Sequence, residues 1–69
     1  MPKNTEYTPI LKFEYKNWLG KVSIRTVVPY EIWFGNTEFH KKEQYLLRAY
    51  DVDKNAERNF ALKDIIKFL

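Results

Sequence analysis

Residues 44–51 read Gln-Tyr-Leu-Leu-Arg-Ala-Tyr-Asp, and this stretch decides the fold. Alternate side chains of a strand share a face, and here both faces are apolar except at Arg48. A strand that is apolar on both faces is usually central, with packed layers above and below it. Arg48 needs an ion-pair partner or a path to water, because a half-buried unpaired cation is costly. We therefore expect a β fold built around this strand.

The composition is that of one small domain without cysteine. A chain of 69 residues lies near the lower limit for folding without a covalent or metal crosslink. The absence of cysteine excludes disulfides and thiolate metal ligands and predicts a cytoplasmic location. The aromatic fraction of 17% exceeds that of disordered chains, and we expect about 3–10 kcal/mol of stability. No stretch approaches the roughly 18 apolar residues of a membrane helix, so no membrane partner is expected.

The charge is mildly basic and unevenly distributed. The net charge is +3, from 12 basic and 9 acidic residues. Residues 1–48 carry eight basic and five acidic side chains, whereas residues 49–69 carry four of each. A positive excess favours phosphate-bearing partners. An ordinary soluble surface explains the same numbers.

The pattern predicts a short arm followed by one domain. Residues 1–9 are polar, with prolines at positions 2 and 9, and predict a flexible N-terminal arm. Residues 10–69 then form a single domain. Alternation of apolar and polar side chains predicts five strands, at residues 10–16, 22–26, 30–34, 44–51 and 58–62.

Two breaks in the pattern shape the expected architecture. Pro29 cannot donate to a strand ladder, so it belongs at an edge, a bulge or a strand start. Apolar residues at positions 62, 65, 66 and 69 have helical spacing and predict a short C-terminal helical turn docked on the sheet. Five short strands with tight turns predict a mainly β fold, a small and strongly bent antiparallel sheet or barrel.

The three arginines are candidate ligand-binding residues. Arg25, Arg48 and Arg58 all fall in predicted strands, and the chain has nine lysines besides. The planar guanidinium suits bidentate contacts with phosphate or carboxylate. The alternative is structural: the arginines pair with acids that orient the sheet, the candidates being Glu14, Glu31, Asp51 and Glu57.

Two tryptophans are candidate stacking platforms for unpaired bases. Trp18 lies in a predicted turn, where an exposed ring is expected. Trp33 alternates with apolar neighbours in a predicted strand, so packing is the more natural role. Packing remains the alternative for both.

Catalytic and metal chemistry are not supported by the sequence. Asp51-x-Asp53-x-Asn55 imitates the start of a calcium loop, but Ala56 and Leu62 replace the required glycine and glutamate. The single histidine, without cysteine, makes a structural zinc site improbable. Serine occurs once and the chain has only two glycines, so neither a serine–histidine–acid set nor a glycine-rich phosphate loop is present. We expect no enzyme, no cofactor and no metal.

Three spacings together resemble the WYL domain, a Sm/SH3-like β-barrel found mostly in bacterial transcription regulators and defence-associated proteins. They are Gly20-x4-Arg25-x3-Pro29, Tyr45-Leu46 and Arg58-x-Phe60-x-Leu62-x2-Ile65. The resemblance implies a ligand sensor whose basic and aromatic groove takes nucleic acids or nucleotides, with Arg25, Tyr45 and Arg58 in that groove. Gln44 stands where the family's name-giving tryptophan would be. No helix-turn-helix precedes the domain in this sequence, so a regulatory role would require a partner.

The leading hypothesis is therefore a stand-alone WYL-like sensor or adaptor that binds single-stranded nucleic acid or a nucleotide. Arg25, Arg48 and Arg58 would contact phosphates, and Tyr45 and Trp18 would stack on bases. The alternative is a protein-interaction module that holds a partner peptide through an aromatic groove or a sheet edge. Salt distinguishes the two, because only phosphate contacts make affinity fall steeply with ionic strength.

Overall fold

One antiparallel sheet makes up most of the computed structural model, which describes residues 9–69. The strands are β1 (Leu11–Lys16), β2 (Val22–Gly35), β3 (Gln44–Asp51), β4 (Ala56–Ala61) and β5 (Ile65–Phe68), and a 3₁₀ turn, η1 (Leu62–Asp64), joins the last two. Their order in the sheet is β4-β3-β2-β1-β5. The prediction of a mainly β, five-stranded antiparallel fold is confirmed. The predicted arm, apart from Pro9, lies outside the described residues.

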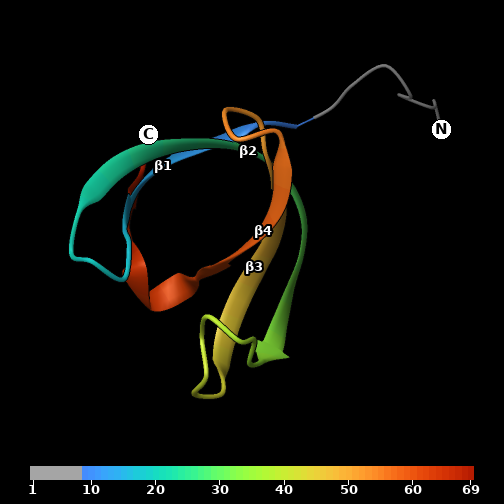
Figure 1. Ribbon diagram of the computed structural model, residues 1–69. Helices are drawn as coiled ribbons and strands as arrows, with labels where there is room; N and C mark the ends of the chain where they lie inside the picture. The colour runs from blue at the N-terminus through green and yellow to red at the C-terminus, as the bar shows by residue number, and fades with distance from the viewer. Residues whose placement is uncertain (1–8) are drawn as a thin grey trace, which may run out of the picture.

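The sheet is strongly bent but not closed. Figure 1 shows β2 curving across the molecule, with β4 and η1 returning beneath it. Among the described strands, the two edge strands β4 and β5 do not pair with each other. A closed barrel is therefore not confirmed. No helix in residues 9–69 is long and apolar enough to cross a membrane.

Strand β2 is longer than the sequence pattern predicts. Separate strands over residues 22–26 and 30–34 were expected, but one strand of 14 residues runs through both, so this prediction was wrong. The register against β3 shifts between Pro29 and Glu31. A bulge accommodates the missing proline N–H and bends the strand without ending it. The first half of β2 thereby pairs with β1 and the second half with β3.

The C-terminal segment is mostly strand, where a helical turn was predicted. The helical part is limited to the three residues of η1, after which β5 pairs antiparallel with β1. Leu69 N continues this contact by donating to Lys12 O at 2.9 Å. The free edge of β1 offers hydrogen-bond partners for the whole segment, whereas a helix of seven residues would lack internal stability. Leu62 and Ile65 still pack against the core, as expected.

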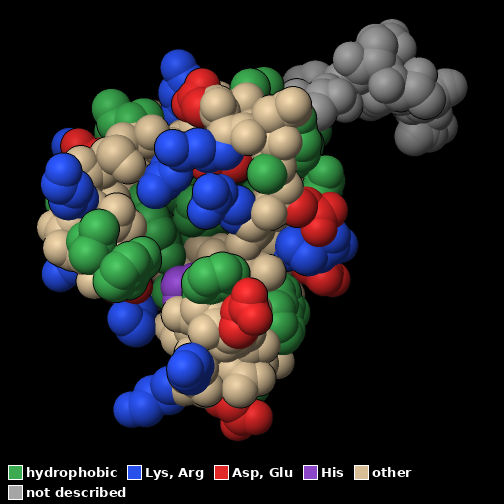
Figure 2. Space-filling view, viewed as in Figure 1, with side chains coloured by type: hydrophobic (Ala, Val, Ile, Leu, Met, Phe, Trp, Pro, Cys, Tyr) green, Lys and Arg blue, Asp and Glu red, His purple; other side chains and the backbone are tan. Residues whose placement is uncertain are grey.

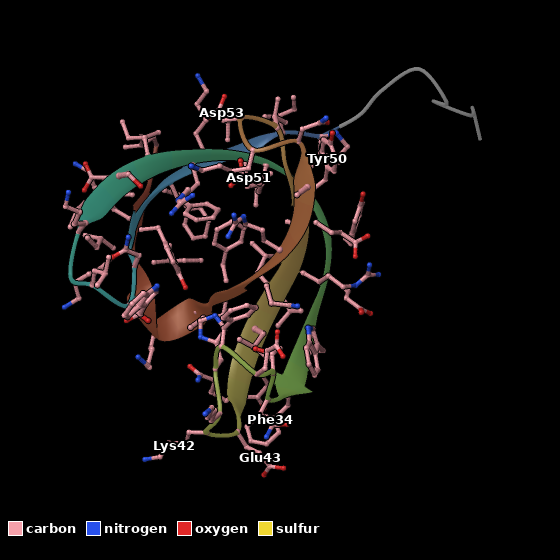
Figure 3. The ribbon with its side chains drawn as sticks, viewed as in Figure 1. Phe34, Lys42, Glu43, Tyr50, Asp51 and Asp53 are labelled. Atoms are coloured by element: carbon pink, nitrogen blue, oxygen red, sulfur yellow. The ribbon has the colours of Figure 1, made fainter. Side chains whose placement is uncertain are left out.

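The core lies inside the bend of the sheet, where side chains fill the space enclosed by the ribbon (Figure 3). Phe60 is 2% exposed, and its ring meets those of Phe13 and Tyr15 edge-on, with centroids 5.3 and 5.0 Å apart. Edge-to-face packing of this kind adds to the gain from burial. The cluster draws on β1, β2, β3 and β4 and consists of Phe13, Tyr15, Val27, Leu47, Ala49 and Phe60.

The opposite face of β3 is buried at Leu46 and only half-covered at Arg48 and Tyr50. Leu46 pairs in register with Trp33 on one side and Ala61 on the other, and both Leu46 and Ala61 are fully buried. The indole Nε1 of Trp33 donates to Asn59 Oδ1 at 2.9 Å. A Cβ at Gly35 would overlap the Trp33 ring, so glycine is required there for the ring to lie flat on the strand. Trp33 thus has a packing role.

Candidate ligand-binding groove

A groove of about 910 Å³ lies beside the free edge of β4. Its walls are the β1–β2 turn (residues 17–21) and the β2–β3 loop (residues 36–43), and we call it the β4 groove. In Figure 2 it is the hollow that contains the single histidine, with Lys and Arg side chains along its rim. Six cations against three acids give the lining an excess of three positive charges: Arg25, Lys41, Lys42, Lys54, Arg58 and Lys63, with Glu38, Glu57 and Asp64.

The first wall is a tightly hydrogen-bonded turn. Asn17 Oδ1 accepts hydrogen bonds from Leu19 N at 2.9 Å and from Lys21 N at 3.0 Å. Gly20 N donates to Asn17 O, and Gly20 has a φ of 84°, a conformation that glycine adopts without strain. The turn holds Trp18 with 86% of its surface exposed. The exposed ring predicted from the sequence is therefore present, and it lines the groove.

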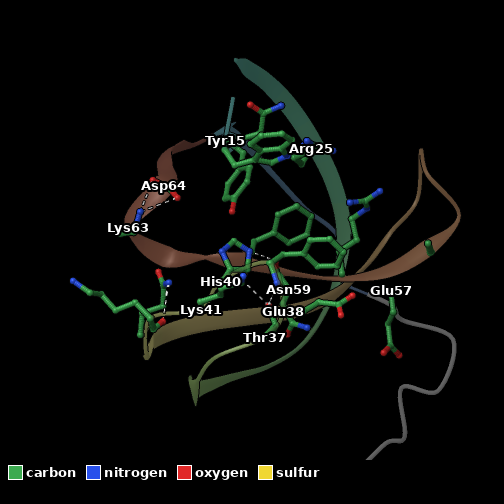
Figure 4. Close-up of a pocket in the computed structure, with 18 of the residues that line it drawn as sticks. Tyr15, Arg25, Thr37, Glu38, His40, Lys41, Glu57, Asn59, Lys63 and Asp64 are labelled. Atoms are coloured by element: carbon green, nitrogen blue, oxygen red, sulfur yellow. Dashed lines mark hydrogen bonds and ion pairs between the residues drawn. The ribbon is translucent and has the colours of Figure 1, made fainter. Parts of the chain in front are cut away.

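The second wall is fixed by Thr37. Its hydroxyl oxygen accepts from Phe39 N at 3.1 Å and from His40 N at 3.0 Å, and its own N–H donates to His40 O. His40 Nε2 lies 3.2 Å from Asn59 O and so ties the loop to β4 (Figure 4). Phe39, on the same loop, is 80% exposed.

Arg25 lies at the base of the groove and is paired with a buried acid. Its Nη1 is 3.4 Å from Asp51 Oδ2, and its guanidinium lies over the Tyr15 and Phe60 rings at 5.8 and 5.9 Å. The other Asp51 oxygen accepts from Asp53 N and Lys54 N. Asp51 therefore shapes the β3–β4 turn and neutralises Arg25. The Asp51-x-Asp53-x-Asn55 segment, which imitates the start of a calcium loop, thus forms a turn between two strands.

Arg58 is the cation best placed to meet a ligand. It pairs in register with Ala49, a core residue, so it extends from β4 on the inner face of the sheet. Its side chain is exposed and lines the groove. Within residues 9–69 it forms no ion pair. Its donors are thus available for an external anion.

Arg48 and Tyr45 lie away from the groove. Arg48 is on the outer face of β3, where Nε is 3.0 Å from Glu31 and Nη1 is 3.3 Å from Glu57, and the cation lies over Tyr30. The hydrogen bond to Glu31 raises the pKa of the Arg48 guanidinium. Tyr45 packs edge-on against Phe34 near the far end of the β2–β3 ribbon. Of the five predicted residues, the β4 groove brings together Arg25, Arg58 and Trp18.

Sequence reasoning missed the contribution of the β2–β3 loop. No site residue was predicted in this loop. Thr37 was a usable signal, because its hydroxyl can fix a turn two or three residues ahead. Nothing in the sequence indicated that His40 would reach the backbone of β4.

Tyr15 makes the free energy of unfolding depend on pH in alkaline solution. Its hydroxyl accepts from Ala61 N at 3.0 Å, and burial raises its pKa above the ordinary value of 10.0 despite that bond. As pH rises past about 10, the unfolded chain loses this proton while the folded chain retains it. The free energy of unfolding should therefore fall with rising pH, by at most about 1.4 kcal/mol per unit from this group.

Urea denaturation of the parent and Tyr15→Phe between pH 8 and 11.5 tests this expectation. The variant should be less stable at pH 8, by about 1–3 kcal/mol for the unpaired Ala61 N–H. The difference should shrink above pH 10. A constant difference across the range would contradict the assignment.

Comparisons of the chain with protein-family models, with curated proteins and with solved structures find no match. The resemblance to the WYL domain thus stays a prediction. The charges and exposed rings of the β4 groove are the features of the fold that bear on function.

Proposed function

We propose that this domain is a WYL-like sensor or adaptor whose β4 groove binds an anionic, base-containing ligand, a single-stranded nucleic acid or a nucleotide. The observation that carries the proposal is the placement of Arg58, without an ion pair in residues 9–69, in the same groove as the exposed Trp18. A guanidinium can hold a phosphate bidentately, and an indole can stack on a base. A regulatory role would follow through a partner protein.

We further propose that the sheet belongs to the Sm/SH3-like barrel type. The bend brings side chains of β1 across the core to β4, where Tyr15 Oη accepts from Ala61 N. The Tyr15 hydroxyl thus satisfies a backbone N–H of β4, an edge strand that no second strand of residues 9–69 pairs with on that side.

Arg58→Ala is the direct test of the binding proposal. Affinity for a fluorescently labelled octathymidylate should fall, and the slope of log affinity against log salt should decrease by about 0.7 for one lost phosphate contact on a single strand. Arg48→Ala is the matched control, because it removes the same side chain from the outer face. Anisotropy titrations at several salt concentrations measure both quantities.

Two results would overturn the proposal. The parent could fail to bind oligonucleotides, mononucleotides or nucleoside diphosphates at low salt. Alternatively, Arg58→Ala and Arg48→Ala could lower affinity equally, which would indicate a general effect of net charge.

A peptide-binding function is the second candidate, favoured by exposed apolar side chains at the end of the β2–β3 ribbon. Ile32, Phe34 and Tyr45 are each more than half exposed, and Figure 3 places Phe34 near the tip. A partner peptide held there would bind with little dependence on salt. Phe34→Ala would weaken that binding, while Arg58→Ala would not.

A further inference from the structure

Two exposed aromatic rings lie on separate walls of the β4 groove. Trp18 belongs to the β1–β2 turn and Phe39 to the β2–β3 loop, and both line the groove. Figure 1 shows this turn and this loop well apart, with η1 between them. Because the rings belong to different segments, each can stack on a base of its own.

Both rings are held on walls that need little reorganisation. Asn17 fixes the turn that carries Trp18, and Thr37 fixes the loop that carries Phe39. A side chain on a preorganised backbone loses less conformational freedom when a ligand binds. Neither ring contributes to the core, since they are 86% and 80% exposed. Such rings are suited to stacking on bases of any identity.

Cations line the same groove as the two rings. Arg58 extends from β4, the strand that runs beside the groove, and Lys41 adds a charge on the loop wall next to His40. Lys63, by contrast, is paired with Asp64 at 3.1 Å (Figure 4). A nucleic-acid backbone held in the groove that both rings line would thus meet cations of the same lining.

We propose that the β4 groove binds single-stranded nucleic acid of at least two nucleotides, with one base on Trp18, another on Phe39 and the intervening backbone on Arg58. This inference rests on the proposed function and narrows its ligand class from nucleotides in general to polynucleotides. It also assigns a binding role to Phe39.

The test is a length series with one probe. Unlabelled thymidylates of one, two, four and eight nucleotides compete with labelled octathymidylate for the parent protein. Stacking is worth about 1–3 kcal/mol per base, which corresponds to about 5- to 140-fold in affinity. The tetranucleotide should therefore compete at least about fivefold more strongly than the mononucleotide.

Three substitutions test whether Trp18 and Phe39 contact the bound bases. Trp18→Ala and Phe39→Ala should each weaken tetranucleotide binding about 5- to 140-fold, and Trp18→Phe should recover part of the loss. Phe34→Ala is the matched control, because its ring is also exposed but lies outside the groove. Thermal melts of all variants confirm that the fold is intact.

The outcomes separate this inference from the proposed function. Equal competition by mononucleotide and tetranucleotide, with Arg58→Ala still weakening both, would overturn the polynucleotide inference and leave a nucleotide site. Unchanged tetranucleotide affinity in Phe39→Ala would likewise overturn it. Failure of every length to bind at low salt would overturn the proposed function as well.

Discussion

Phe60→Ala should lower the free energy of unfolding by about 3–5 kcal/mol, the usual cost of deleting a buried aromatic ring. Phe60 is 2% exposed and contacts the rings of both Phe13 and Tyr15, so a cavity would open where β1 faces β4. A domain of this size is expected to have only about 3–10 kcal/mol of stability. The variant should thus be partly or largely unfolded at room temperature.

Phe39→Ala is the matched control for this substitution. It removes the same ring from a position that is 80% exposed, and surface changes of this kind usually alter stability by less than about 0.5 kcal/mol. Urea denaturation followed by far-ultraviolet circular dichroism compares the two variants with the parent. If Phe60→Ala were as stable as Phe39→Ala, the inward orientation of Phe60 would be wrong.

The sequence predicted strand orientation well where one face is buried. Phe13 and Tyr15 alternate with polar neighbours, and both point into the core as their spacing requires. Residues 44–51 carry apolar side chains on both faces. Leu47 and Ala49 are buried on the inner face of β3 and Leu46 on the outer face, where Arg48 and Tyr50 are half-buried. Apolar periodicity is a direct consequence of burial, so the orientation of a half-buried strand can be predicted from its sequence.

Strand continuity could not be predicted by the same means. Pro29 interrupts the alternation, and only the pairing of Ala49 and Arg48 with β2 shows that the strand continues through a bulge. The C-terminal apolar residues have a spacing compatible with a helix, but the free edge of β1 supplies partners for a strand. Both outcomes depend on neighbours that are distant in sequence.

The candidate site was predictable only in part, for a related reason. Arg25 and Arg58 face the inner side of the sheet and Arg48 faces the outer side, a division set by register. Sequence spacing alone did not show which of the three arginines share a face of the sheet. The structural alternative holds for Arg48 with Glu31 and for Arg25 with Asp51, while Arg58 has no such acid within residues 9–69.

Arg25→Ala should lower the free energy of unfolding by about 3 kcal/mol, because it leaves the Asp51 carboxylate without its cation. Asp51 has 1% of its side chain exposed, and its remaining hydrogen bonds come from the backbone of the β3–β4 turn. Those bonds keep the expected loss at the lower end of the range for broken buried pairs. Arg25→Lys should lose less, since it keeps the charge.

A double-mutant cycle with Asp51→Asn decides whether the pair accounts for this loss. The asparagine oxygen can still accept from Asp53 N and Lys54 N, while the negative charge is gone. Arg25→Ala in that background should therefore cost at least about 1 kcal/mol less than in the parent. Equal losses in both backgrounds would show that Arg25 acts through its contacts with Tyr15 and Phe60 alone. The predicted coupling would instead show that Arg25 stabilises the fold through Asp51. Arg58 would then be the groove arginine whose removal tests ligand binding without loss of structure.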